Sequence, residues 1–121
     1  MDIKTLPNIG HPVAYYPSLC RIVESPKAAI FFSQLLYWHG EGEKDGWSYK
    51  TSEQLEEETG LTYEEQKIAR SKLRKMKLVK EHNAKAGYRL YFQVDIDKLV
   101  ELLGPALPPA NKRLRPTKRS I

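Results

Sequence analysis

The sequence predicts a single α + β domain, mainly α-helical, with a small antiparallel sheet. Three observations lead to this prediction. Residues 51–76 contain two helix-start signals separated by a glycine, and residues 79–94 contain two strand-like segments around a turn-like one. The length of 121 residues is ordinary for one domain, and a content of 40% apolar residues suffices for one core.

The first fifty residues are expected to support the rest of the domain. Residues 1–16 contain two prolines and a glycine and are predicted to be irregular. Pro17–Val23 fits a short helix with proline near its start. Ser25 is a good N-cap before Pro26, and the helix that follows is apolar nearly all round, which predicts a buried central helix. Residues 47–49 alternate and are predicted to form an edge strand.

Two helices joined by a tight turn are predicted next. Thr51 and Gln54 have the spacing of a capping box, and Gly60 is a natural helix stop. Thr62 and Glu65 repeat the capping-box spacing directly after that stop. Two capped helices separated by so short a turn indicate a helix-turn-helix more strongly than either helix alone.

A strand pair and a last helix complete the predicted domain. Val79–His82 and Tyr88–Val94 are predicted strands around the turn-like residues 83–87. Asp95 is the predicted N-cap of a short helix over residues 96–103. Helix, turn, basic helix and two strands in this order are typical of a winged helix-turn-helix with a small antiparallel wing sheet, whose second helix lies in the major groove of DNA.

The charge is distributed unevenly along the chain. Residues 1–103 hold 15 basic and 15 acidic side chains, so the net charge of +5 resides in residues 104–121. We interpret residues 104–121 as a flexible Pro-rich basic tail or linker. Residues 41–66 hold nine acids and two bases, whereas residues 67–89 hold nine bases and one acid, Glu81. A neutral body with a basic face is the pattern expected of a DNA-binding protein.

The helix predicted over residues 63–76 contains most of the candidate DNA contacts. By helical spacing, Gln66 shares the inward face with apolar residues, yet Gln66 and Lys67 also lie in the first turns, where a recognition helix approaches bases. Arg70 and Arg74 are long bidentate donors that suit guanine. The predicted DNA-binding residues are Gln66, Lys67, Arg70, Ser71, Arg74 and Lys77 from this segment, with Lys85 and Arg89 in the wing.

Signatures of enzymes are absent from the sequence. It contains no glycine-rich phosphate loop, no Gly-x-Ser-x-Gly, and no paired cysteines or histidines with metal-ligand spacing, so we expect neither catalysis nor a cofactor or metal. The single cysteine, Cys20, cannot form an internal disulfide and favours a reducing, cytoplasmic setting. No apolar run approaches the roughly 20 residues that a membrane helix requires.

Segments spread over residues 13–100 form a set that resembles a known family. They include Tyr15–Leu19, Lys27–Trp38, Gly46–Thr51, Glu53–Leu55, Thr59–Thr62, Gln66, Ala69–Leu73 and Lys77–Val79. The set resembles the N-terminal winged-helix DNA-binding domain of phage and mobile-element replication initiators of the replisome-organiser type.

This resemblance implies sequence-specific binding of repeated origin sequences in double-stranded DNA, inside a bacterial host cell and associated with the nucleoid. It implies contacts with a replicative helicase or its loader through regions not in this chain, which has no second domain after the tail. It assigns the DNA-reading role to Gln66, Lys67, Arg70, Ser71 and Arg74, with Lys85 and Arg89 in the wing. The tail resembles the start of a linker, which leaves open whether the chain is an excised domain.

Two other functions are compatible with the same residues. One is a small phage transcriptional regulator that uses the same fold and helix. The other is a winged-helix protein-interaction module, an inhibitor or adaptor, without DNA binding. A homodimer is expected from half-site geometry and from the aromatic residues Tyr15, Tyr16 and Trp47, predicted to be exposed.

Overall fold

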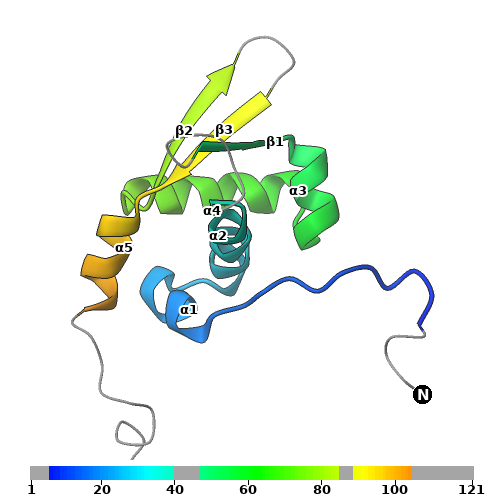
Figure 1. Cartoon of the computed structure of the whole chain (residues 1–121), viewed down its shortest axis with the longest axis horizontal. Coiled ribbons are helices and arrows are strands. Elements are labelled where there is room, and N and C mark those ends of the chain that lie inside the picture. Colours follow the sequence, from blue (N-terminus) through cyan, green and yellow to red (C-terminus); the bar gives the residue numbers. More distant parts are fainter. Residues whose placement is uncertain (1–5, 40–46, 85–88, 105–121) are drawn as a thin grey trace, which may run out of the picture.

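The computed structural model describes residues 6–39, 47–84 and 89–104. Their order is α1 (Pro17–Val23), α2 (Pro26–His39), β1 (Trp47–Lys50), α3 (Ser52–Thr59), α4 (Tyr63–Lys75), β2 (Val79–Ala84), β3 (Arg89–Val94) and α5 (Ile96–Leu103). This is a mainly helical α + β fold with a small antiparallel sheet, so the predicted fold class is confirmed (Figure 1). The tail that begins after Gly104 lies outside the described residues.

Helix α2 lies at the centre of the molecule, as its apolar sequence predicts. It contacts α1, α3, α4, β1 and β3 (Figure 1). The Ser25 hydroxyl accepts a hydrogen bond from the Ala28 backbone N–H at 3.1 Å, which caps the helix at its expected start. Phe31 is fully buried and packs edge-on against Phe92 of β3, with ring centroids 5.9 Å apart. Such aromatic pairs contribute about 0.5–1.5 kcal/mol beyond their buried area, and this one joins α2 to the sheet.

The sheet has the strand order β1-β3-β2, with both neighbouring pairs antiparallel. The predicted strand near Trp47 is confirmed as β1, an edge strand paired with β3. Strand β2 continues two residues beyond the expected end at His82, because Asn83 pairs with Leu90 and the following residue also continues the ladder. Since β2 and β3 form a hairpin directly after α4, the base of this hairpin lies close to the end of that helix.

Helices α3 and α4 are joined by the predicted turn. The Thr51 hydroxyl accepts from the Gln54 backbone N–H at 3.1 Å, and the Gln54 side chain accepts from the Thr51 N–H at 2.9 Å. Thr62 and Glu65 form the same reciprocal pair at the start of α4. Gly60 adopts the left-handed conformation, with φ of 78°, that favours glycine at a helix end. Both capping boxes and the glycine stop are therefore confirmed.

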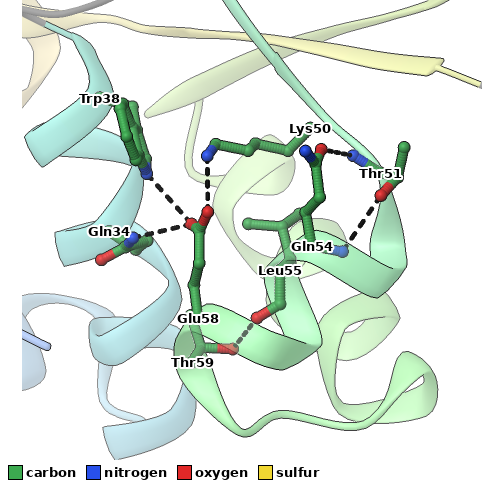
Figure 2. A network of polar contacts seen from close by, with 8 residues as sticks. All are labelled: Gln34, Trp38, Lys50, Thr51, Gln54, Leu55, Glu58 and Thr59. Carbon is green, nitrogen blue, oxygen red and sulfur yellow. Dashed lines mark hydrogen bonds and ion pairs between the residues drawn. The ribbon is translucent and has the colours of Figure 1, made fainter. Parts of the chain in front are cut away.

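Glu58 connects α3 to α2 and β1. Its carboxylate accepts hydrogen bonds from Gln34 Nε2 at 2.8 Å, Trp38 Nε1 at 3.1 Å and Lys50 Nζ at 2.6 Å (Figure 2). Lys50 also lies over the Trp38 ring, 3.7 Å from its centroid. Burial alone would raise the pKa of Glu58, but the hydrogen bonds from Lys50, Gln34 and Trp38 outweigh it and hold the pKa below its ordinary value.

The Glu58 contacts correct an expectation from the sequence. The run of three glutamates at residues 56–58 reads as a solvated face, and Glu56 and Glu57 are indeed exposed. Glu58 follows the buried Leu55 by three residues and so shares its inward side of the helix. The Glu58 contacts fix α3 in place, and α3 in turn positions α4.

Candidate nucleic-acid interface

The start of α4 is held against α3 by Gln66. This side chain is only 1% exposed, and its Nε2 donates to the carbonyl oxygens of Ser52 at 3.1 Å and Leu61 at 3.0 Å. Both amide hydrogens are thereby used to satisfy backbone acceptors of α3 and the turn. The expected DNA contact by Gln66 is incompatible with this geometry, and its helical spacing with Ala69 and Leu73 is the reason.

Arg70 is committed to an ion pair inside the domain. Its Nε donates to Glu81 Oε2 at 3.1 Å and its Nη2 to Glu81 Oε1 at 3.0 Å, with side chains that are 16% and 11% exposed. The role expected of Arg70 as a reader of guanine therefore does not match its position. The sequence contained a signal for this pair, since Glu81 is the one acid among residues 67–89.

Arg74 shares the same carboxylate but remains accessible. Its Nη1 donates to Glu81 Oε2 at 2.9 Å, while 44% of the side chain is exposed. This pair fixes the orientation of the guanidinium group and leaves Nε and Nη2 as donors for a ligand. Arg74 therefore remains a candidate DNA contact.

The face of α4 that points to solvent is defined by burial. It lies opposite Ala69 and Leu73, which are buried. We call it the outward face; it consists of Glu64, Lys67, Ile68, Ser71, Arg74 and Lys75.

The predicted row of cations does not follow the centre of this outward face. Lys67 and Arg74 lie toward one border of the face, and Arg70 lies beyond that border. Exposed Lys75 and half-buried Ser71 lie nearer the middle. Neither Lys75 nor Ile68 is among the predicted DNA-binding residues, because the prediction follows the spacing of charge and not the side opposite the buried residues.

Lys67 has weak partners within the chain. Its Nζ lies 3.9 Å from a carboxylate oxygen of Glu64 and 5.4 Å from the ring centroid of Tyr63. The Lys67 side chain is 51% exposed, so the ion pair is screened by solvent and contributes little. Lys67 is thus only weakly held by its neighbours in the described part of the chain.

Lys77 follows the C-cap residue of α4, Met76. Its backbone is left-handed, with φ of 64°. The Leu78 N–H donates to the Leu73 carbonyl at 3.0 Å and the Lys77 N–H to the Arg74 carbonyl at 2.9 Å, which together form a Schellman motif. Lys77 therefore does not continue the helical row of Lys67 and Arg74, although its side chain is exposed.

The structure describes the two predicted wing residues, Lys85 and Arg89, only in part. Lys85 lies outside the described residues. The backbone of Arg89 begins β3 opposite Ala84, and its side chain is also outside the described part of the chain. Lys80 on β2 is an exposed cation on the described part of the hairpin.

A cavity of about 780 Å³ lies away from the outward face, between residues 10–14, α2 and α3. Tyr37, Trp38 and Glu58 contribute to its wall. The Glu58 carboxylate already accepts three hydrogen bonds, so it offers no unpaired charge to a ligand.

Comparison of the chain with protein-family models, curated proteins and solved structures finds no match. No helix within the described ranges is both long and apolar enough to cross a membrane. The same ranges contain no cluster of three or more His, Cys, Asp or Glu side chains that could hold a metal ion.

Proposed function

We propose that this chain is a winged helix-turn-helix domain that binds double-stranded DNA with sequence preference. In this proposal α4 enters the major groove and the β2–β3 hairpin contacts the backbone. The proposed biological role is origin recognition by a phage or mobile-element replication initiator. The observation that carries the proposal is the outward face of α4, which presents Lys67, Arg74 and Lys75 to solvent on a firmly positioned helix.

The dimensions and charge of α4 suit this role. An α-helix with its side chains is about 10–12 Å across, and the major groove of B-DNA is about 12 Å wide. Exposed lysines and arginines on such a helix neutralise phosphates and release counterions, which supplies affinity. Arg74 can also provide directional hydrogen bonds. Glu81 orients its guanidinium group, while two donors remain for phosphate or guanine.

The proposed positioning of α4 depends on groups behind it. Gln66 ties the helix to α3, and Glu58 ties α3 to the central helix. Arg70 and Glu81 tie α4 to β2. A recognition helix held directly at Gln66 and Arg70, and supported through α3, keeps its contacts in register with the bases, which supports sequence preference over unspecific attraction.

A transcriptional regulator would bind DNA through the same helix. Its binding site would overlie a promoter, whereas the site of an initiator would be a repeated sequence within an origin. The position of the bound sequence in the genome of the element therefore separates the two roles.

A protein-interaction module is the second candidate function. It is favoured by the apolar exposure on α4, where Ile68 is 70% and Tyr63 51% exposed. It is also favoured by the neutralisation of Arg70 by Glu81. This candidate predicts no DNA affinity at moderate salt and a protein partner that docks on the outward face.

Gel-shift assays with fragments of the genome of the element, at about 150 mM salt with competitor DNA, test the proposed function. We expect one repeated fragment to be retained and the variant Lys67→Ala/Arg74→Ala/Lys75→Ala to lose it. Arg21→Ala, which removes an exposed cation from α1, serves as the control and should bind like the wild type. If competitor DNA removes all binding to the fragments, the protein-interaction module is favoured.

A further inference from the structure

Ile68 lies on the outward face of α4, on the side of that face away from Lys67 and Arg74. Its side chain is 70% exposed, the largest exposed fraction among the large apolar side chains that the structure describes. By helical spacing its neighbours on this face are Glu64, Ser71 and Lys75, all polar or charged. Single exposed isoleucines are common on protein surfaces and need no functional explanation. This one, however, lies on the face that the proposed function brings against base edges.

The chemistry of the major groove limits what such a side chain can recognise. Base edges there present hydrogen-bond donors and acceptors at every pair and only one apolar group, the C5-methyl of thymine. Isoleucine has no hydrogen-bonding group, so contact with the amino groups of adenine or cytosine would remove water without compensation. Contact with a methyl group instead buries apolar surface on both partners.

We propose that Ile68 is a specificity-determining residue that recognises the C5-methyl group of a thymine. This inference rests on the proposed function and makes it more specific. The position within α4 supports it, because Ile68 lies in the first half of the helix, where recognition helices approach base edges. Lys67 and Arg74 lie toward the border of the face nearer β2 and suit phosphate contacts, which position the protein without reading sequence.

The experiment removes only the methyl group. Duplexes that the full chain prefers are selected from a random pool, and each thymine of the selected site is replaced in turn by deoxyuridine. At one thymine we expect the dissociation constant of the wild type to rise about fourfold, the factor that corresponds to burial of one methyl group. Ile68→Ala should bind the thymine and deoxyuridine duplexes equally. Ile96→Ala, which truncates a partly exposed isoleucine on α5, is the matched control and should keep the fourfold difference.

The outcomes separate this inference from the proposed function. If a preferred duplex is selected but no deoxyuridine replacement weakens wild-type binding, the inference is overturned while DNA binding stands. The same holds if Ile68→Ala keeps the full penalty for deoxyuridine, or if the selected site contains no thymine. If no duplex is preferred at all, the proposed function itself fails and this inference fails with it.

Discussion

Arg70 and Glu81 join α4 to β2 through two parallel hydrogen bonds, from Nε to Oε2 at 3.1 Å and from Nη2 to Oε1 at 3.0 Å. Both side chains are largely buried, and the same carboxylate also holds the more exposed Arg74. The pair therefore connects the candidate recognition helix to the hairpin that follows it, so that the two are expected to meet a ligand as one unit.

Removal of the Glu81 carboxylate should destabilise the domain strongly. Glu81→Gln leaves the charge of Arg70 largely buried without a counter-charge, for which we expect a loss of about 2–4 kcal/mol in the free energy of unfolding. Urea denaturation followed by circular dichroism measures it. Glu64→Gln is the control, because Glu64 is 75% exposed and its lysine partner is 3.9 Å away, so it should change stability by less than about 0.5 kcal/mol.

A double variant tests whether the loss comes from the unpaired charge. Arg70→Met/Glu81→Met replaces both members by apolar groups and should recover most of the stability that Glu81→Gln loses. A Glu81→Gln protein as stable as the wild type would contradict the structural role assigned to the pair.

Gln66→Met should lower stability without changing the DNA contacts of the folded protein. Methionine has a similar volume but no donors, so the carbonyls of Ser52 and Leu61 lose their hydrogen bonds, at a cost of about 1–3 kcal/mol. Thermal denaturation measures the loss, and binding titrations well below the melting temperature measure the affinity. An unchanged melting temperature combined with a tenfold weaker affinity would mean that Gln66 reads DNA after all.

Lys77→Gly should stabilise the domain. Lys77 occupies the left-handed position of a Schellman motif, which disfavours a side chain, and glycine there should gain up to about 1 kcal/mol. A higher urea midpoint is the expected result. Glycine at Lys67, an exposed position in the interior of α4, is the control and should destabilise by about 1 kcal/mol. Equal effects at the two positions would contradict the left-handed geometry of Lys77.

The stability of the domain should fall in acid partly through Glu58. Its pKa is held below the ordinary value of 4.5 in the folded state, so its contribution is complete above that value and is lost as the pH falls through the lower folded pKa. Glu65, whose pKa the hydrogen bond from Lys27 lowers, contributes with the same sign. The urea midpoint is measured as the pH is lowered from neutral to below 4.5. It should fall less steeply with decreasing pH for Glu58→Gln than for the wild type. Glu57→Gln, at an exposed neighbouring position, should keep the wild-type slope, and an identical slope in Glu58→Gln would refute the assignment.

Local signals in the sequence predicted the elements of the fold well. Capping residues such as Thr51 and Thr62, the glycine stop at Gly60, and the apolar run of α2 all act within a few residues, so they can be recognised without tertiary structure. The end of β2 was predicted two residues too early, at His82. Asn83 belongs to the strand only because β3 pairs with it, and this pairing is not a local signal.

The contacts of the candidate site were less predictable, because its side chains pair with residues that are distant in the sequence. The neutralisation of Arg70 depends on Glu81 eleven positions further along, and the hydrogen bonds of Glu58 depend on Lys50 and on side chains of α2. Helical spacing did place Gln66 on the inward face, but it could not show that two backbone carbonyls would use its amide. The exposure of Ile68 followed from the same spacing once the buried side of α4 was known.

The salt dependence of DNA affinity in single-alanine variants shows whether the outward face of α4 binds the duplex. Dissociation constants are measured between about 50 and 200 mM salt for the wild type, Lys67→Ala, Arg74→Ala, Lys75→Ala and the control Arg21→Ala. If the outward face of α4 binds the duplex, each phosphate contact removed from it should reduce the slope of log K against log salt by about 0.9, and Arg21→Ala should leave the slope unchanged. Identical slopes and affinities in all five proteins would mean that α4 does not bind DNA and that any DNA contact lies elsewhere on the molecule.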